Sequence, residues 1–514
     1  MVRTKANQDS AGSREFYRKK LQTKRLRGCL ENTTTKVAWQ FSFGLAAGLL
    51  LASFDLVDHS FNRSMVVAAV LYVLQGMICL FADRQIRAGI LSQKGEIGSG
   101  ARLLGLLLIL FICFGNFFAS IAGFMLLKRE KGIEYQLTVY STLSLIIVFA
   151  VSCLNMLKPY VVDTYYYGMG LLLVMILFNL ALLFLSNRWV KGRRVDKRIL
   201  PLAVLSMLQI CYGNLFGLVF GLIVISKYRH TDEDISIEWV DVVRRLFRNY
   251  MSVIGVFIVV FLISLSVVSL LTFDYDMAIS NDYANILRAP SLAYPFGTDN
   301  YGRCVFTRIV FGARISLIVG ILATLLPIVV GGFLGAVAGY YGKMTDNTIM
   351  RALDILYAVP SILLAITIIA AFGANTVNLI LALSVGSIPI YARTVRATVM
   401  SISQQEFVEA ARACGAKDLA IILQHIIPNS LAPVIVRATL EIGGAVLSTS
   451  ALSYLGLGVE PHIPEWGNIL KLGSSYLETN PYIAIFPGLA IIILVLAFNY
   501  FGDGLRDALD PKLK

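Results

Sequence analysis

The sequence predicts an all-α protein that crosses a membrane many times. Of its 514 residues, 57% are hydrophobic and only 15% are charged, whereas soluble domains contain about 45–50% apolar and about 25% charged residues. The apolar residues form runs that reach the roughly 20 residues a helix needs to cross a bilayer. They lack the alternating pattern of membrane β-strands, which are only about 10 residues long. Each run therefore predicts a membrane-spanning helix.

The net charge of +13 would also suit a nucleic-acid-binding protein, but its distribution favours a membrane protein. Residues 1–36 hold ten Lys and Arg against three Asp and Glu, and most other basic residues flank apolar runs. Membrane proteins place basic residues in this way on the cytoplasmic side. We therefore expect a basic cytoplasmic N-terminus over residues 1–36 and no nucleic-acid partner.

Histidine and cysteine give no sign of a metal site. The four histidines and seven cysteines are dispersed, without the spacing of metal ligands or of a disulfide framework. No nucleophile–base pattern stands out either. We therefore expect no metal and no catalytic residue in this chain.

An N-terminal membrane module is expected over residues 37–226. Its predicted spans are 37–57, 64–82, 103–127, 138–157, 165–186 and 200–226. The motif Ile-Cys-Phe-Gly-Asn at 112–116 recurs as Ile-Cys-Tyr-Gly-Asn at 210–214, each time after a span and a basic loop. A duplication, with copies over 37–128 and 138–227, explains this internal repeat.

The two Gly-Asn segments leave two topologies open. If 103–127 and 200–226 both cross the membrane, the basic loop 187–199 faces outward, against the positive-inside tendency. If they are re-entrant hairpins, every basic loop lies inside. Length favours six spans, and charge favours four spans with two hairpins. We lean slightly to the hairpins.

The second half of the chain predicts a compact set of spans with its C-terminus in the cytoplasm. Residues 227–249 are expected to form a cytoplasmic linker and a short amphipathic helix, and 250–514 the membrane core. The predicted core spans are 250–272, 314–340, 355–373, 377–398, 431–455 and 482–502. With residue 249 inside, the loop 399–430 and the C-terminus also lie inside.

The inner loop 399–430 carries the most informative pattern. An Ala- and Glu-rich helix around Glu409 is expected to end at Gly415, because glycine after a last turn stops a helix. A second helix follows, and Pro428 is expected to break it. The sequence thus predicts a small knob on the inner face. Such a knob would transmit rigid-body motion from a partner protein to the flanking spans.

This pattern resembles the coupling-loop signature of ABC-importer permeases. Glu409-Ala410-Ala411 is followed by Gly415 and then by Pro428-Asn429. More specifically, residues 239–514 look like the C-type permease of dipeptide, oligopeptide and nickel importers. Further matching stretches are Tyr294 to Arg303, Ser453 to Val459 with Trp466-Gly467-Asn468, and Gly502 to Pro511. The chain departs from the family's usual pattern at Cys304 and at Asn249-Tyr250-Met251, and residues 1–238 are not part of the usual permease.

The resemblance implies a six-helix type I ABC-importer permease core and a set of partners. These are a B-type permease subunit, two cytoplasmic ABC ATPases and an extracytoplasmic substrate-binding protein. ATP and Mg would bind the ATPases, since Gly342-Lys343 lacks the flanking residues of a phosphate loop. The residues expected to couple to the ATPases are Glu406, Glu409, Ala410, Ala411, Gly415, Ala416, Lys417 and Asp418.

Three further groups are candidates for other roles. A spacing of four puts Gly331, Gly335 and Gly339 on one helix face, where they predict close helix packing. The intramembrane pair Arg437 and Glu441 is a candidate for lining the path. The candidates for an outer docking surface are Gly297, Thr298, Asp299, Gly302 and Arg303.

The expected function is that of a permease subunit forming half of an ATP-driven import path. The substrate is expected to be oligopeptides or dipeptides, with nickel or another small solute as the alternative. A secondary transporter is less favoured, because the N-terminal spans contain few buried acids. The expected location is the bacterial plasma membrane, in contact with lipid and with both termini in the cytoplasm.

Overall fold

The computed structural model describes residues 30–55, 60–61, 63–91, 99–127, 132–158, 161–191, 194–229 and 238–510. Three predictions extend outside these described residues. They are the basic segment up to residue 29, the linker at 230–237, and the end of the terminal motif from Pro511.

The all-α class is confirmed. By length and composition, eight helices among the described residues are able to cross a membrane, or nine if one bent pair counts as a single span. The described strands are only two residues long and form two small antiparallel ladders, β1 (Phe54–Asp55) with β2 (Ser60–Phe61) and β3 (Val190–Lys191) with β4 (Arg194–Val195).

The chain forms two compact units. The first comprises Met1–Leu143 with Ala181–Ile199, and the second comprises Ser144–Leu180 with Leu200–Lys514. Helices α6 (Ile133–Cys153) and α7 (Tyr165–Trp189) run from one unit into the other. The second unit thus joins part of the expected N-terminal module to the expected core.

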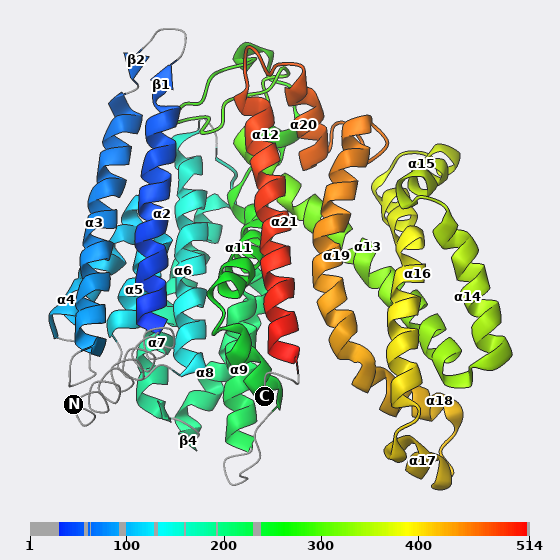
Figure 1. The fold of residues 1–514 in the computed structure, drawn as a ribbon. Helices are drawn as coiled ribbons and strands as arrows, with labels where there is room; N and C mark the ends of the chain where they lie inside the picture. The colour runs from blue at the N-terminus through cyan, green and yellow to red at the C-terminus, as the bar shows by residue number, and fades with distance from the viewer. Residues whose placement is uncertain are drawn as a thin grey trace, which may run out of the picture. The chain divides into compact units, whose positions relative to one another are not determined.

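In the first unit, the segment around Gly115 is a helical hairpin packed on two long helices. Its elements are α2 (Leu30–Ala52), α3 (Arg63–Leu91), α4 (Ser99–Leu110), η1 (Phe111–Phe114) and α5 (Phe117–Leu127). Helices α2 and α3 lie side by side (Figure 1). The amide of Asn116 donates to Ser42 of α2 at 2.8 Å and to Gln75 of α3 at 2.9 Å. Asn116 thereby fixes the tip of the hairpin between both helices.

The second Gly-Asn segment has the same form. It consists of α8 (Leu200–Met207), η4 (Leu208–Tyr212) and α9 (Leu215–Arg229). Gly115 and Gly213 both have left-handed backbones, with φ of 76° and 72°, which glycine adopts at little cost. Both segments fold back on themselves, which is the geometry that the charge pattern favours. Each arm is shorter than the roughly 20 residues of a full span.

The second unit contains the helices of the expected core. In order they are α10 (Glu238–Leu246), α11 (Tyr250–Thr272), α12 (Asp276–Ile279), η5 (Tyr283–Asn285), α13 (Val305–Tyr341), α14 (Lys343–Ala358), α15 (Ser361–Phe372), α16 (Thr376–Ile402), α17 (Glu406–Ala413), α18 (Asp418–Ile421), η6 (Ile422–Ile426), α19 (Ile427–Leu455), α20 (Trp466–Ser474) and α21 (Tyr482–Leu509). The main packing partners are α13 with α16 and α21 with both α11 and α19.

One predicted core span has a different form. Residues 355–373 were expected to be a single helix, but α14 and α15 meet at an angle of 83°. The bend lies at Val359, which is extended, with φ −84° and ψ 126°. The cause is Pro360, because a proline disfavours helical geometry in the residue before it.

Candidate functional site

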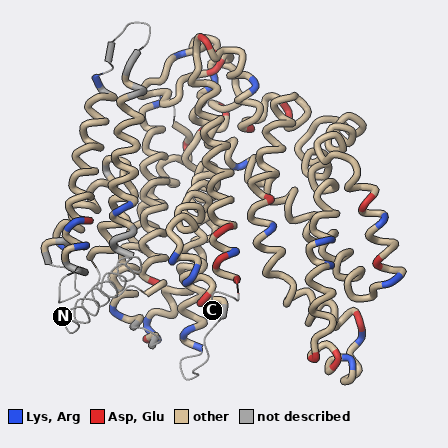
Figure 2. The backbone as a smooth tube through the Cα atoms, viewed as in Figure 1, with Lys and Arg blue, Asp and Glu red and all other residues tan. Residues whose placement is uncertain are grey.

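The predicted coupling loop is a folded knob at the ends of two core helices. Helices α17 and α18 lie beyond the ends of α16 and α19, and charged residues gather on them (Figures 1 and 2). A π-helical turn, η6, leads from α18 into α19. The apolar side chains of Val408, Ile421 and Ile426 are buried against α16. The knob is therefore packed onto the core.

Gly415 ends the first helix of the knob, as expected. Its φ is +81°, its N–H donates to Arg412 O, and Ala416 N–H donates to Ala411 O. These bonds satisfy the last carbonyls of α17. Nothing lies within 4 Å of where a Cβ at Gly415 would stand. The glycine is thus required by backbone geometry and leaves open space beside it.

Most of the predicted coupling residues are exposed on the knob. Val408 turns inward, and Phe407 is 37% exposed beside the acidic residues. Ala411 and Ala416 are half-buried. The exposed members of the predicted set are Glu406, Glu409, Ala410, Gly415, Lys417 and Asp418. The knob therefore offers carboxylates and small side chains to any protein that approaches it.

A tyrosine that the sequence did not single out ties the knob to α13. The Tyr340 hydroxyl donates to Asp418 Oδ1 at 2.7 Å and accepts from Arg412 Nη2 at 3.0 Å. The guanidinium of Arg412 also lies 5.6 Å from the centre of the Tyr340 ring. Tyr340 thus joins both helices of the knob to the end of the longest core helix. In the sequence, only its position at the end of a predicted core span could have pointed to Tyr340.

Replacing Tyr340 with phenylalanine is expected to loosen the knob without unfolding the core. The variant loses both hydrogen bonds but keeps the ring, so the expected cost is about 1–3 kcal/mol. Hydrogen exchange of residues 406–421 should speed up by tenfold or more, ~1.4 kcal/mol. Tyr341→Phe, next to it and without these bonds, is the control. Equal exchange in both variants would contradict this role of Tyr340.

The three glycines of α13 lie against α16. A Cβ at Gly331 would stand 2.5 Å from Ile388 O, and one at Gly339 would stand 2.9 Å from Arg396 O. A Cβ at Gly335 would overlap the carbonyl oxygen of Ala392. Backbone oxygens cannot be moved aside as side chains can. The glycine face therefore permits the closest approach between α13 and α16.

Charged side chains form ion pairs on the core helices. Arg437 Nη2 and Glu441 Oε2 are 3.2 Å apart along α19, with side-chain exposures of 45% and 25%. Helix α16 pairs with α14, through Arg393 with Asp354 at 2.6 Å and through Arg396 with Asp346. The pairing of Arg437 with Glu441 follows from their i,i+4 spacing, whereas the other two pairs depend on tertiary packing.

The predicted outer-loop residues build the loop rather than its surface. Thr298, Asp299 and Arg303 are buried. Asp299 Oδ2 lies 2.8 Å from Arg303 Nε and 3.7 Å from Arg308 Nε. Gly297 and Gly302 have φ of 72° and 78°, and a side chain on either would collide with neighbours. A docking partner would instead meet exposed neighbours such as Tyr283, Ile286 and Leu292.

Two buried charges in this part of the core were missed by sequence reasoning. Arg308 is fully buried and donates through Nη1 to Ala278 O at 2.7 Å. Glu465 is also fully buried and accepts from Asn468 N–H at 3.1 Å at the start of α20. Burial raises the pKa of the Glu465 carboxyl, against hydrogen bonds that lower it. Arg308 thereby holds α12 against α13, and Glu465 caps the start of α20.

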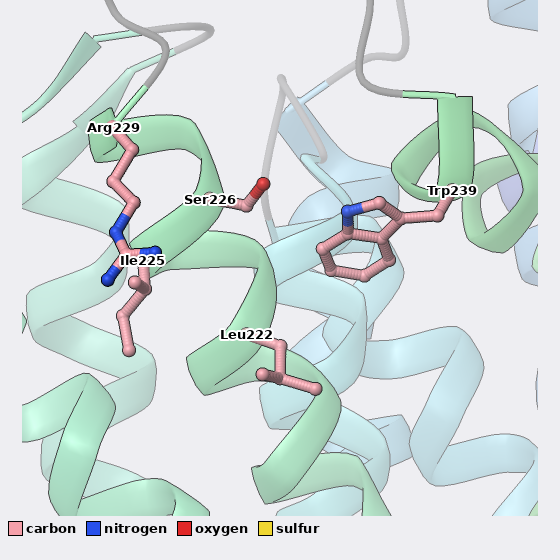
Figure 3. A pocket seen from close by; sticks show the side chains of 5 residues that line it. All are labelled: Leu222, Ile225, Ser226, Arg229 and Trp239. Atoms are coloured by element: carbon pink, nitrogen blue, oxygen red, sulfur yellow. The ribbon is translucent and has the colours of Figure 1, made fainter. Parts of the chain in front are cut away.

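A cavity of about 330 Å³ lies between α9 and α10. Figure 3 shows its lining, which contains one cation and no acid: Leu222, Ile225, Ser226, Arg229 and Trp239.

Among the residues that the structure describes, no cluster of three or more His, Cys, Asp or Glu side chains is able to hold a metal.

Comparison with known proteins identifies the core. Residues 331–514 match the family model "Binding-protein-dependent transport system inner membrane component", and residues 238–290 match "N-terminal TM domain of oligopeptide transport permease C". Both matches lie within the predicted resemblance over 239–514, give or take one residue.

Relatives among characterised proteins cover the same part of the chain. The dipeptide transport system permease protein DppC of Alkalihalophilus pseudofirmus is 44% identical over 276 residues, which are 54% of this chain and 90% of that protein. The glutathione transport system permease protein GsiD of Pectobacterium atrosepticum is 41% identical, over 55% of this chain and 94% of that protein.

A solved structure of the MetNI methionine ABC transporter, in an inward-facing conformation, is also similar. It has a TM-score of 0.33 and 22% identity, and the match covers 39% of this chain and 96% of that chain.

The high identity over nearly the whole length of these permeases decides the family, and the resemblance noted in the sequence is confirmed. The chain is a multi-pass membrane transport component, in a family that works with ATPase and substrate-binding partners. It therefore belongs to the permeases of binding-protein-dependent ABC transport systems.

Proposed function

We propose that this chain is the C-type permease subunit of a bacterial peptide importer. The knob formed by α17 and α18 is the observation that carries this proposal. It is packed on the core through Val408 and Ile421 and tied to α13 through Tyr340. A partner that moves the knob would therefore move α13, α16 and α19 with it. Interfaces of this kind convert a change in a partner into a rigid-body shift.

The proposed complex contains a second permease, two ATPases and a substrate-binding protein besides this chain. A B-type permease would complete the path, and two cytoplasmic ATPases holding ATP and Mg would bind the two coupling loops. An extracytoplasmic binding protein would deliver the substrate at the opposite face. The proposed location is the plasma membrane, with both termini in the cytoplasm and the knob on the same side. The chain itself would carry no catalytic residue.

The proposed substrate is a dipeptide or an oligopeptide. The two relatives described above are named for dipeptide and glutathione transport, which favours peptides over nickel. Uptake of labelled peptides and of nickel should be compared in vesicles containing the assembled transporter. ATP-dependent peptide uptake is expected. Uptake of nickel but not of peptides would contradict the proposed peptide substrate. Uptake in the absence of the ATPases would contradict an ATP-driven mechanism.

Replacing Gly415 with valine is expected to uncouple transport while leaving membrane insertion intact. A β-branched residue at φ +81° costs roughly 1–2 kcal/mol, and the open space at the position means that this cost is backbone strain alone. We expect peptide uptake to fall about tenfold, ~1.4 kcal/mol. Gly415→Asn is the matched control, since asparagine tolerates the left-handed conformation. Normal uptake in the valine variant would count against the knob as the coupling element.

A further inference from the structure

The end of α6, the start of α7 and the segment between them make polar and packing contacts with the core that the import mechanism does not use. Ser152, Asn155, Lys158, Thr164 and Gly168 take part, all from the expected N-terminal module and all within the second compact unit. These five residues, called the brace residues below, contact the end of α11 and the start of α13. In the topology proposed above, this is the extracytoplasmic end of the core.

Two brace residues cap the end of α11. The last carbonyls of a helix have no partner within the helix. Here Asn155 Nδ2 donates to Thr272 O at 2.7 Å, and Thr164 Oγ1 donates to Leu271 O at 3.0 Å. The cap of this core helix is therefore supplied by the module. A permease without the module would have to satisfy both carbonyls by other means.

Lys158 links that helix end to α13. Its side chain is only 7% exposed, and its Nζ donates to Thr307 Oγ1 at 2.5 Å, in the first turn of α13. The ammonium also lies 5.4 Å from the ring centre of Phe273 and 5.8 Å from that of Phe306. Ring faces attract cations at such distances. A buried ammonium requires compensation of this kind, which the Thr307 hydroxyl and the two rings provide.

Close packing accompanies the polar contacts. A Cβ at Gly168 would stand 2.9 Å from Thr272 Cγ2 and 3.0 Å from Leu271 Cβ, so α7 approaches α11 closely. The hydroxyls of Ser152 and Thr272 lie 3.2 Å apart. Tyr165, Leu172 and other apolar residues of the module join Phe273 and Phe311 in one core cluster. Apolar packing thus accompanies the buried polar contacts of Ser152, Asn155 and Lys158.

We propose that the part of the N-terminal module within the second compact unit is a permanent brace of the permease core, in which the brace residues hold the ends of α11 and α13 together throughout the transport cycle. The brace keeps the end of α11 and the start of α13 together. Motion that reaches the core through the knob then displaces the other core helices relative to this fixed pair of helix ends. This part of the module would then be a structural element of the permease core.

The first test measures local stability. Lys158→Ala removes the ammonium and Asn155→Ala removes the donor to α11, and each should speed limited proteolysis of the exposed loop 280–292 about tenfold in the full chain. Lys197→Ala, at an exposed lysine of the module, is the control and should leave the rate unchanged. If Lys158→Ala does not accumulate, Asn155→Ala decides. Rates equal to the control in the variants that accumulate would overturn the brace.

The second test asks whether the contact persists during transport. Ser152→Cys with Thr272→Cys, in a Cys153→Ala background, should form a disulfide on oxidation. The assembled transporter carrying this cross-link should take up substrate as fast as its reduced form and as each single-cysteine variant. Loss of uptake that a reductant restores would show that the module separates from α11, which overturns a permanent brace. The proteolysis test needs no substrate, so its outcome is independent of the peptide proposal.

Discussion

Replacing Asp299 with alanine is expected to destabilise the folded protein strongly. The carboxylate lies beside two buried guanidiniums, Arg303 and Arg308, and its Oδ1 accepts from the N–H groups of Tyr301 and Arg303 at 2.9 Å each. Removing one partner of a buried ion pair costs about 3–5 kcal/mol. Whole proteins are stable by only about 5–15 kcal/mol. The variant should therefore lose a large part of its stability, with a lower unfolding temperature and a lower folded yield.

The measurement is the amount of monodisperse protein extracted from membranes, together with its unfolding temperature. Asp276→Ala is the matched control, because Asp276 is an exposed acid in the same segment and makes no ion pair with another described residue. The control should behave like the unaltered protein. If Asp299→Ala gave the same folded yield as the control, the charges of Arg303 and Arg308 would not depend on Asp299 for compensation, which would contradict this role of Asp299.

Replacing Gly335 with alanine is expected to push α13 and α16 apart. The new methyl group would overlap the carbonyl oxygen of Ala392, and the backbone of α16 must shift to admit it. Overpacking of this kind costs about 1–3 kcal/mol. The unfolding temperature in detergent should fall, and uptake should fall with it.

Gly332 provides the control for this substitution. It is the next residue, and a Cβ there would stand 3.8 Å from Val395 Cγ2, an ordinary contact. Gly332→Ala should therefore be neutral in the same measurements. If both variants unfold at the same temperature, close approach at Gly335 is not what holds α13 to α16.

The helices were largely predictable because the bilayer imposes a simple rule on sequence. Apolar runs such as 250–272 and 482–502 became α11 and α21, since a segment in lipid must satisfy its own backbone. Glycine and proline marked the ends, as at Gly415. The polar helix α14 was missed because it is not apolar throughout, although Pro360 signalled the bend that follows it.

The interactions of the candidate site were less predictable than its location. The Glu-Ala-Ala pattern located the knob, but Tyr340 is 78 residues from Asp418, and no local periodicity joins residues so far apart. The outer-loop motif was equally visible in the sequence. Whether Asp299 faces solvent or two arginines depends on the folding of the whole loop, which a single sequence does not encode in any local pattern.

The π-helical turn at Ile422–Ile426 has a consequence for the apolar pattern of the segment that joins the knob to α19. In an α-helix, residues five positions apart point about 140° away from each other, because 3.6 residues complete one turn. A π-turn closes its hydrogen bonds over five residues, so this wider turn brings Ile421 and Ile426 back to the same side, and both are fully buried. A regular α-helix over the same residues would point one of the two isoleucines away from that side. The additional residue in the turn thus lets both side chains join the same apolar cluster.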